Sequence, residues 1–351
     1  MLTHAKKRAR SSARTSKSNR KLRAARWARV AVAAAAPVIA AGPVASPALA
    51  NSQSAASHYE FRTLDNPKDP TFNQLLGINQ DGLIAGYFGS GLKDHPNQGY
   101  LLNARHGQQI YRSENWPQSV QTQVTGLNDR GVTVGFWSTM NNGGATPVND
   151  NRAFVSEHGY FINGDFPMAT QALPVDQLLG VNDHNVAVGF YNDAQGNTHA
   201  YTFDIGRNAF NEVTPSGITN PTGAAINNRG DIAGFGTDSS GDATNGKQVG
   251  YLLKRDGSVT ILAVPGASQT QALGVNDRRE VVGVYTAADG NMHGFTWTPW
   301  GGFQTVDDTP AAAASTTING VNDRGQLVGF YTDAGNNTHG FLANPLRQHR
   351  D

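Results

Sequence analysis

Short apolar runs recur along this chain, and residues typical of tight turns separate them. An apolar run ends in asparagine, a polar tetrad follows, and a second apolar run ends in a glycine–aromatic pair, as in "LLGVNDHNVAVGFY". Runs of this length, bounded by turn residues, favour β-strands over helices. Each such stretch therefore predicts a β-hairpin.

The hairpin occurs six times, at intervals of 45 to 54 residues. Its anchoring asparagines are Asn79, Asn128, Asn182, Asn227, Asn276 and Asn322. A glycine lies seven residues after each anchor, at Gly86, Gly135, Gly189, Gly234, Gly283 and Gly329. Self-similarity with this period predicts an array of equal structural units.

The tetrad between the two strands has the composition of a type I turn. Asparagine suits the first position, and the fourth often takes a left-handed conformation that glycine adopts freely. Glycine or asparagine fills that fourth position in five repeats, as Gly82, Gly131, Asn185, Gly230 and Gly325. Arg279 fills it in the fifth repeat, which predicts a strained or differently shaped turn there.

Each hairpin is followed by a loop and a third strand, and five of the six repeats have a fourth strand. The third strands are "QGYLLN", "RAFVSE", "HAYTFD", "VGYLLK", "HGFTWT" and "HGFLAN", and the last of these has no fourth strand after it. An unpartnered strand, "HYEFRTLD" at 58–65, precedes the first repeat instead. This strand is predicted to complete the sixth repeat.

Six four-stranded units with a shared last unit predict a six-bladed β-propeller. Propellers have four-stranded blades around a central channel, and closing the ring with strands from both termini pairs edges that would otherwise be exposed. A β-solenoid is the alternative, but it would leave the split last unit unexplained. We therefore expect residues 51–351 to form one six-bladed domain.

The repeats also resemble a known family. "GVNDRGQLVGFYTDAGNNTHGFL", at 320–342, is similar to the HAF-type extracellular repeat of exported bacterial proteins, and the resemblance covers nearly all of residues 75–342. Its His-[Ala/Gly]-aromatic element is complete at His199, His293 and His339, whereas Gln98, Arg152 and Val249 replace the histidine elsewhere. The resemblance implies export and β-repeats but no particular reaction.

The recurring residues have structural interpretations. The anchor asparagines are predicted to cap turns rather than bind calcium, and the three histidines to bond the backbone of a neighbouring blade rather than a metal. The small residues two before each anchor would sit where inner strands crowd, at Gly77, Gly126, Gly180, Ala225, Gly274 and Gly320. The glycine seven after each anchor would let the next blade approach.

The loops between the second and third strands differ most between repeats, and function tends to reside on such loops. The longest belong to repeats one, two and four. They supply the candidate binding residues Trp137, Asp94, His95, Asp150, Asp238 and Asp242. Trp137 could stack on a sugar ring, and the others could bind calcium or act in acid–base chemistry.

The first fifty residues have the features of an export signal. They hold eleven basic residues and no acidic one, then an alanine-rich apolar stretch ending in Ala48-Leu49-Ala50. Cleavage after Ala50 is expected. A transmembrane anchor is the weaker alternative, because Pro37 and Pro43 interrupt a run already shorter than the roughly 20 residues of a span.

Removal of the signal leaves 17 basic and 27 acidic residues, a formal charge of −10. Such a chain is a poor partner for nucleic acid or an anionic membrane surface. Cysteine is absent, which excludes disulfides and thiolate chemistry, and no cofactor is predicted; calcium is an option without support in the sequence. We expect a secreted monomer without a membrane anchor.

The sequence carries no G-x-S-x-G elbow, phosphate loop, H-E-x-x-H or dinucleotide fingerprint. It therefore leaves catalysis undecided. The first hypothesis is a secreted binding or scaffold module with an acidic, loop-rich face for an extracellular polysaccharide or protein. The alternative is a carbohydrate-active hydrolase or lyase with its site at the channel mouth, because propellers host both classes.

Overall fold

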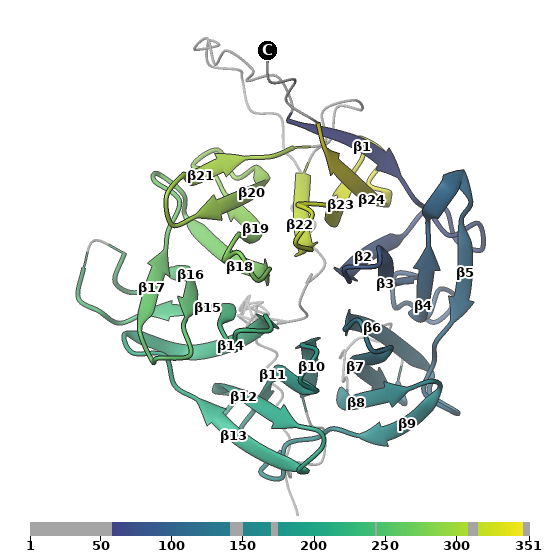
Figure 1. Cartoon of the computed structure of the whole chain (residues 1–351), viewed down its shortest axis with the longest axis horizontal. Helices are drawn as coiled ribbons and strands as arrows, with labels where there is room; N and C mark the ends of the chain where they lie inside the picture. The colour runs from purple at the N-terminus through teal and green to yellow at the C-terminus, as the bar shows by residue number, and fades with distance from the viewer. Residues whose placement is uncertain (1–57, 141–149, 170–174, 243, 308–314, 347–351) are drawn as a thin grey trace, which may run out of the picture. The chain divides into compact units, whose positions relative to one another are not determined.

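The chain forms an all-β structure whose sheets lie around a common axis, as in a β-propeller (Figure 1). It is a computed structural model that describes residues 58–140, 150–169, 175–242, 244–307 and 315–346, all within one compact unit. These residues contain 24 strands and one short 3-10 turn, η1 (Arg105–Gly107). The predicted β-propeller is confirmed; the predicted signal at 1–50 and its cleavage after Ala50 lie outside the described residues.

Four sheets have four strands each, paired antiparallel in chain order. The first contains β2 (Asn73–Ile78), β3 (Leu83–Phe88), β4 (Gln98–Asn103) and β5 (Ile110–Ser113). The second contains β6 (Gln121–Leu127), β7 (Val132–Ser138), β8 (Arg152–Glu157) and β9 (Tyr160–Asn163). The third contains β10 (Asp176–Val181), β11 (Val186–Asn192), β12 (Thr198–Asp204) and β13 (Ala209–Val213). The fourth contains β14 (Ile218–Ile226), β15 (Ile232–Asp238), β16 (Gln248–Leu253) and β17 (Val259–Leu262).

The remaining strands form one eight-stranded sheet. It contains β18 (Gln269–Val275), β19 (Val281–Thr286), β20 (Met292–Thr298), β21 (Gly302–Thr305), β22 (Ser315–Val321), β23 (Leu327–Thr332), β24 (Thr338–Pro345) and β1 (Tyr59–Thr63). A single parallel bridge between Met292 and Ser315 joins β20 to β22. The prediction of six separate four-stranded blades is therefore corrected: strand pairing among the described residues gives four such sheets and one of eight strands.

The N-terminal strand lies beside the last strand of the chain, as predicted. β1 pairs antiparallel with β24, with Phe61 opposite Ala343. The pairing is extended by backbone hydrogen bonds from Leu64 N to the Gly340 carbonyl at 2.7 Å and from Leu346 N to the His58 carbonyl at 2.8 Å. The Phe61 and Phe341 rings also meet edge to face at 5.2 Å. Both ends of the described chain thus share one sheet.

Apolar side chains fill the spaces between neighbouring sheets. Between the second and third sheets, for example, Val134 and Val155 join Leu178 and Phe203 in one buried cluster. The first sheet packs in the same way against β23 and β24, where Val328 and Leu342 join a cluster with Leu75, Ile84 and Tyr100. The core is therefore distributed around the axis, between the faces of adjacent sheets.

The glycines predicted to allow close approach do so, in two different ways. A Cβ atom at Gly77 would lie 3.2 Å from the Cα of Gly126, so the small residue before the anchor meets the neighbouring inner strand as expected. The glycine seven after the anchor behaves differently: a Cβ at Gly283 would overlap the carbonyl oxygen of Gln271 in the same sheet. At this position the tightest contact is within the sheet, because a bulge in the inner strand brings its own carbonyl there. The next sheet also comes near: a Cβ at Gly223 would lie 3.3 Å from the Gly189 carbonyl oxygen.

The tetrads form the predicted turns. In each, the anchor side chain accepts backbone N–H bonds within the turn, as from Val132 N to Asn128 Oδ1 at 3.0 Å. Arg279 has a φ of 62° and keeps the hydrogen bond from its N–H to the Asn276 carbonyl at 3.0 Å. It is therefore strained but not differently shaped. Its guanidinium reaches the fully buried Asp231 of the preceding repeat at 2.8 Å, which gives a reason for arginine here.

Replacing Arg279 by glycine is expected to destabilise the fold despite the relief of strain. The substitution gains about 1 kcal/mol from the backbone but leaves the buried Asp231 carboxylate without its cation, at a cost of about 3 kcal/mol. The free energy of unfolding in urea should fall by the difference. In the double variant Arg279→Gly/Asp231→Val each position receives the residue that the second repeat has there, Gly131 and Val132 respectively, and most of the loss should be recovered. No recovery would contradict the pairing argument.

Candidate functional site

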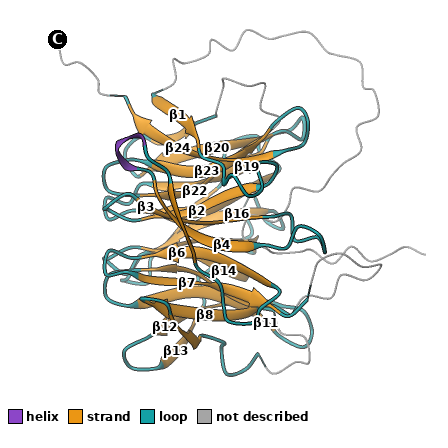
Figure 2. Ribbon diagram, turned by 90° about the vertical axis from the view of Figure 1, so that its right-hand side faces the viewer, coloured by secondary structure: helices purple, strands orange, loops and turns teal. Residues whose placement is uncertain are grey.

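The two ends of the sheets differ in their connections. Turns between first and second strands, and between third and fourth, emerge together with η1 on one side, called here the turn face (Figure 2, left). Loops between second and third strands, and the connections that lead to the next inner strand, emerge on the other side, called the loop face. Antiparallel pairing of consecutive strands within each repeat produces this separation.

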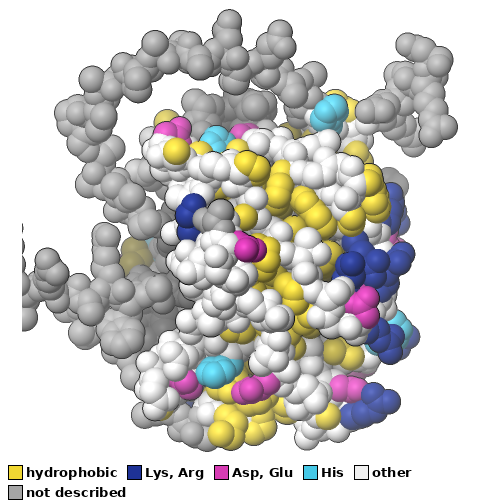
Figure 3. Space-filling model, turned by 90° about the vertical axis from the view of Figure 1, so that its left-hand side faces the viewer, with side chains coloured by type: hydrophobic (Ala, Val, Ile, Leu, Met, Phe, Trp, Pro, Cys, Tyr) yellow, Lys and Arg dark blue, Asp and Glu magenta, His cyan; other side chains and the backbone are white. Residues whose placement is uncertain are grey.

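Charge is distributed unevenly between these faces. The described loop-face connections carry the carboxylates Asp65, Asp69, Asp94, Glu114, Asp150, Asp165, Asp193, Asp242, Asp289, Asp307 and Asp333. Their basic residues are limited to Lys68, Lys93 and Lys247. Lysine and arginine gather instead along the turn face, which is the right-hand edge of Figure 3. The predicted acidic, loop-rich face is thus one side of the molecule.

The six candidate binding residues do not converge on one site. Asp94 and His95 lie in the loop of the first sheet. Trp137 lies in β7 and Asp150 in the loop after it, and Asp238 ends β15, with Asp242 in the loop after it. Asp94 and Asp242 are exposed, whereas Asp150 and Asp238 are 5% and 1% exposed.

The two buried carboxylates hold their own loops. Asp150 accepts hydrogen bonds from the hydroxyls of Ser138 and Thr139, each at 2.8 Å. Asp238 accepts one from the Ser240 N–H at 2.8 Å and a short one from the Thr244 hydroxyl at 2.5 Å. His95 lies 3.2 Å from the buried Asp69 of the adjoining connection. These contacts shape the loops that carry the exposed candidates.

Trp137 is packed within its sheet. Its ring stacks on Trp116 with 4.9 Å between centroids and 3° between planes. The guanidinium carbon of Arg152 lies 5.9 Å from the ring centroid. Arg152 is the cross-strand partner of Trp137 and occupies the position that histidine takes in other repeats. The indole therefore forms part of a stack with Trp116 and Arg152.

The three histidines repeat this arrangement. Each stacks on the tyrosine opposite it on the second strand, in the pairs Tyr191–His199, Tyr285–His293 and Tyr331–His339, with centroids 4.9 to 5.3 Å apart. Each imidazole also bonds a carboxylate: Asp193 for His199, Asp307 for His293, and both Asp65 and Asp333 for His339. The predicted bond to a neighbouring backbone is therefore corrected, since aspartates supply the acceptors.

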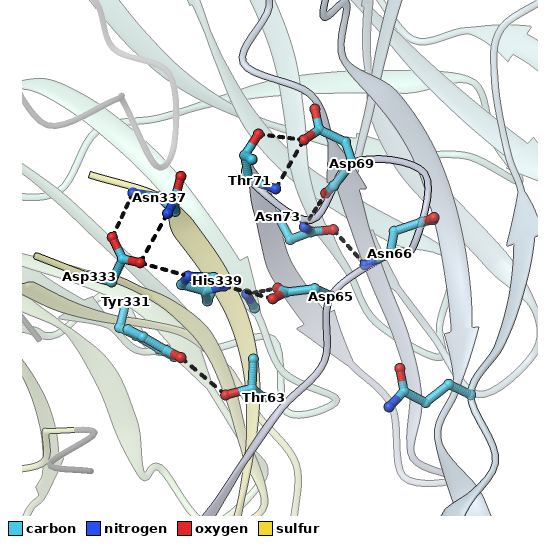
Figure 4. Close-up of polar contacts among 12 residues, drawn as sticks. Thr63, Asp65, Asn66, Asp69, Thr71, Asn73, Tyr331, Asp333, Asn337 and His339 are labelled. Atoms are coloured by element: carbon cyan, nitrogen blue, oxygen red, sulfur yellow. Dashed lines mark hydrogen bonds and ion pairs between the residues drawn. The ribbon is translucent and has the colours of Figure 1, made fainter. Parts of the chain in front are cut away.

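His339 has the most complete set of partners (Figure 4). Its Nδ1 lies 2.6 Å from Asp65 Oδ2 and its Nε2 lies 3.3 Å from Asp333 Oδ2. The Tyr331 hydroxyl is 3.1 Å from the Thr63 hydroxyl. Asp65 follows β1, whereas Asp333 and His339 belong to the last repeat, so this group joins the two ends of the chain. Thr63, Asp65, Tyr331, Asp333 and His339 are called here the terminal cluster.

The cluster favours a protonated imidazole. Burial lowers the pKa of His339, but the hydrogen bonds to Asp65 and Asp333 outweigh it, and the pKa is raised. Burial raises the pKa of Asp65 against the opposing effect of His339. The Asn337 side chain and backbone, with a further contribution from His339, lower the pKa of Asp333 to about 2. An imidazolium between two carboxylates is the arrangement that these directions describe.

Stability should depend on pH through His339. Because its folded pKa is raised, its contribution is complete below the unfolded value near 6.5 and is lost as pH rises through the folded value. The urea midpoint of the native chain should therefore fall between pH 6 and pH 9. The His339→Gln variant should lack this component of the decline; an unchanged pH dependence in the variant would contradict the assignment.

One recurrent feature was missed by the sequence reading. The residue two positions after the outer strand accepts a backbone N–H bond from the third strand: Asp65 from Gly340, Asn115 from Gly99, Asp165 from Ala153 and Asp307 from Gly294, at 2.7 to 3.2 Å. The signal was present in "RTLD", "RSEN", "INGD" and "QTVD". Aligning the repeats on the third strand would have revealed it.

The anchor asparagines do more than cap turns. Each donates its side-chain amide to the backbone carbonyl of the next anchor, from Asn79 to Asn128 and onward to Asn322, at 2.9 to 3.3 Å. Asn322 then donates to the Asn79 carbonyl at 3.1 Å, so this chain of bonds returns to its start. A capping role alone predicts only the bonds within each turn.

Groups of three or more histidine, cysteine or acidic residues able to hold a metal ion do not occur among the described residues. The described part of the chain also contains no helix with the length and hydropathy needed to cross a membrane.

Comparison with known proteins gives similarity at the level of architecture. No family model matches the chain, and no curated protein matches it. A solved structure of AofleA from Arthrobotrys oligospora has a TM-score of 0.48 at 10% identity, with 83% of this chain and 88% of that chain covered. The SapL1 lectin in complex with alpha methyl fucoside has a TM-score of 0.49 at 8% identity, covering 80% and 98%. Trypanosoma rangeli sialidase has a TM-score of 0.47 at 10% identity, covering 78% and 55%.

Proposed function

We propose that the chain is an exported binding or scaffold module of the HAF-repeat type, built as a closed six-bladed propeller. In this view the eight-stranded sheet acts as two blades, β18–β21 and β22–β24 with β1. Two observations support it. The bridge that joins these blades has counterparts between other sheets, at Phe72–Thr338 and Asn151–Val175. The hydrogen bonds from the side-chain amides of the anchor asparagines link all six repeats in sequence.

The loop face is the proposed binding surface. The observation that carries this proposal is the excess of carboxylates over lysine and arginine in the described loop-face connections, with Asp94, Asp242 and Asp289 exposed at the tips of three different loops. A face of this charge attracts cationic groups and repels polyanions. The proposed partner is an extracellular protein or polysaccharide that is neutral or basic, and the module is proposed to act as a secreted monomer without a cofactor.

A glycan array that includes chitosan and neutral polysaccharides, run beside a reducing-sugar assay, tests this proposal. Retention without product release is expected, and the triple variant Asp94→Asn/Asp242→Asn/Asp289→Asn should retain less ligand than the native chain. Asp81→Asn/Glu157→Gln/Asp256→Asn removes three exposed carboxylates of the turn face; it is the matched control and should retain as much ligand as the native chain. Equal retention by the triple variant would contradict the proposed surface.

The hydrolase or lyase alternative has one observation in its favour. Acid–base catalysis needs ionisable side chains that converge on substrate, and Asp65, Asp333 and His339 do converge. However, His339 lies on β24 and the two aspartates lie on connections near the chain ends. Their main role in this proposal is to hold the two ends of the chain together. Release of reducing sugar that is lost in His339→Gln, with the fold retained, would favour the enzyme.

A further inference from the structure

A small cavity lies on the axis at the turn face, and all six repeats line it. Its volume is about 110 Å³. For comparison, an apolar protein cavity of about 150 Å³ holds benzene. A narrow aliphatic chain therefore suits this cavity better than a sugar ring. Its wall and its mouth differ in chemistry.

The mouth is formed by the residue after each anchor: Gln80, Asp129, Asp183, Asn228, Asp277 and Asp323. Each accepts, through a side-chain oxygen, the backbone N–H of the corresponding residue in the preceding repeat, at 2.7 to 3.0 Å. The described residues place no lysine, arginine or histidine in an ion pair with these four carboxylates. The mouth is therefore a fixed ring of polar side chains whose four carboxylates have no ion-pair partner among the described residues, although Arg130, Arg278 and Arg324 follow three of them in the sequence.

The electrostatics of the ring agree with this description. Burial raises the pKa of Asp129, and the nearby carboxylates of Asp183, Asp81 and Asp323 raise it further. Asn228 offsets part of the repulsion on one side, since its amide donates to Asp183 Oδ2 at 2.8 Å and Asp277 Oδ2 at 3.1 Å. On the other side, Asp129 and Asp323 flank Gln80. A cation at the mouth would relieve the repulsion between them.

Deeper in the cavity the wall is mostly apolar, with two polar side chains, Thr125 and Asn319. The Thr125 hydroxyl donates to the Leu178 carbonyl at 2.7 Å, so it already has a partner. Ile78, Leu127, Val181, Ile226, Val275 and Val321 form a layer below the mouth. In the next layer Asn319 occupies the position that leucine holds as Leu76, Leu179 and Leu273. Asn319 is 4% exposed; its amide Nδ2 donates to the Leu75 carbonyl at 3.0 Å, and its Oδ1 has no partner. A buried carbonyl oxygen without a donor is costly, so it marks a place for a hydrogen-bond donor.

We propose that this axial cavity binds a small aliphatic ammonium compound whose far end carries a hydrogen-bond donor. The ammonium group lies among the carboxylates of the mouth, the chain passes the aliphatic layer, and the far hydroxyl or amine donates to Asn319 Oδ1. Asn319 lies in β22 and Asp323 two residues beyond its end, so their Cα atoms are at most about 13 Å apart, the length of four fully extended residues. Side chains span part of this distance, and a ligand of about six carbons spans the rest. The cavity lies on the side of the molecule opposite the loop face. This proposal therefore does not depend on the function proposed for the loop face.

A metal ion fits these observations less well. A directly bound cation needs several carboxylate oxygens within coordination distance, and the described residues hold no group of three that meets this requirement. In the mouth, one oxygen of each aspartate is already occupied by a backbone N–H. An ammonium group needs only hydrogen-bond contact with a few of the remaining oxygens.

Calorimetric titration with 6-aminohexan-1-ol tests the proposal on the full exported chain. Saturable binding is expected, and hexylammonium, which lacks the donor, and hexane-1,6-diol, which lacks the charge, should each bind about tenfold more weakly. The double variant Asp129→Asn/Asp323→Asn should bind the amino alcohol at least about tenfold more weakly than the native chain does. Asn228 shows that asparagine can occupy this ring, so folding should be retained, as circular dichroism can verify. Glu157→Gln/Asp256→Asn removes two exposed carboxylates at outer turns of the same face; it is the charge-matched control and should bind normally.

A second variant separates the inner contact from the mouth. Asn319→Leu copies the residue of three other repeats, so it should fold, and it should bind the amino alcohol and hexylammonium equally. Absence of saturable binding, or equal binding by the native chain and the double asparagine variant, would overturn the proposal. A saturable response to calcium chloride without one to the amino alcohol would overturn it in favour of a metal site.

Discussion

A chain without residues 58–63 should lose most of its stability, by about 4 kcal/mol or more. The deletion removes β1 and leaves one edge of β24 unpaired. It also removes the ring contact between Phe61 and the fully buried Phe341, and the hydrogen bond between the Thr63 and Tyr331 hydroxyls. Urea unfolding followed by tryptophan fluorescence would measure the loss against the chain that begins at residue 51.

Addition of the missing strand as a peptide provides the control. A synthetic peptide of residues 58–66 should restore stability, because β24 offers the same backbone groups to a strand added in trans. A scrambled peptide should not. A deletion variant that unfolds like the parent chain, or that responds equally to both peptides, would show that β1 contributes little.

Gly283→Ala should be among the most destabilising single substitutions, at about 4 kcal/mol or more. A Cβ at this position overlaps the carbonyl oxygen of Gln271 in the paired strand, and backbone there cannot move without disrupting the β18–β19 ladder. In the other repeats, a Cβ at the equivalent glycine would overlap the equivalent carbonyl oxygen of the paired strand. The thermal unfolding midpoint of the purified variant, and its expression yield, would each be measured against the native chain.

Gly206→Ala is the matched control for this substitution. A Cβ at Gly206 would meet Asp204 Oδ1 at 3.7 Å, an ordinary contact, and its backbone does not require glycine. Its unfolding midpoint should stay close to that of the native chain, within about 0.5 kcal/mol in free energy. Similar losses in the two variants would remove the steric explanation.

The sequence predicted the repeat well, because its signals are local. Turn chemistry at the tetrads, alternating apolar runs and the unpartnered strand at 58–65 correctly predicted the hairpins and the pairing of β1 with β24. The left-handed position of Arg279 was also anticipated from its neighbours in the alignment. Such features depend on a few adjacent residues, or on one missing strand, and need no knowledge of packing.

The contacts between repeats were harder to predict. The sequence spacing of the anchor asparagines does not predict that the amides of Asn79 and Asn322 reach the next repeat. The distance in space between neighbouring anchors depends on how closely the inner strands pack around the axis. The partners of His339 come from a residue 274 positions away and from a loop. The eight-stranded sheet likewise depends on a single bridge between Met292 and Ser315. Each is a tertiary distance that composition does not encode.

The candidate site shows the same division. Asp94 and Asp242 were predicted on loops and are exposed there, but Asp150 and Asp238 proved to be buried supports for those loops. Sequence alone does not distinguish an aspartate that caps a loop from one that faces solvent, since both favour the same turn positions. The acidic loop face follows from topology, which sorts connections by strand direction.

The proposed closed propeller requires the N-terminal strand to complete the last of the six repeats. Because the native chain has no cysteine, a designed disulfide reports directly on this contact. Glu60 lies opposite Asn344. Directly opposite residues of a hydrogen-bonded pair lie about 5.5 Å apart, which suits a disulfide. Glu60→Cys/Asn344→Cys should form an intramolecular crosslink in the folded state, detected by mass spectrometry of a tryptic digest, whereas Glu60→Cys/Glu157→Cys should not. Failure of the first pair to crosslink, or equal crosslinking by both, would contradict the claim.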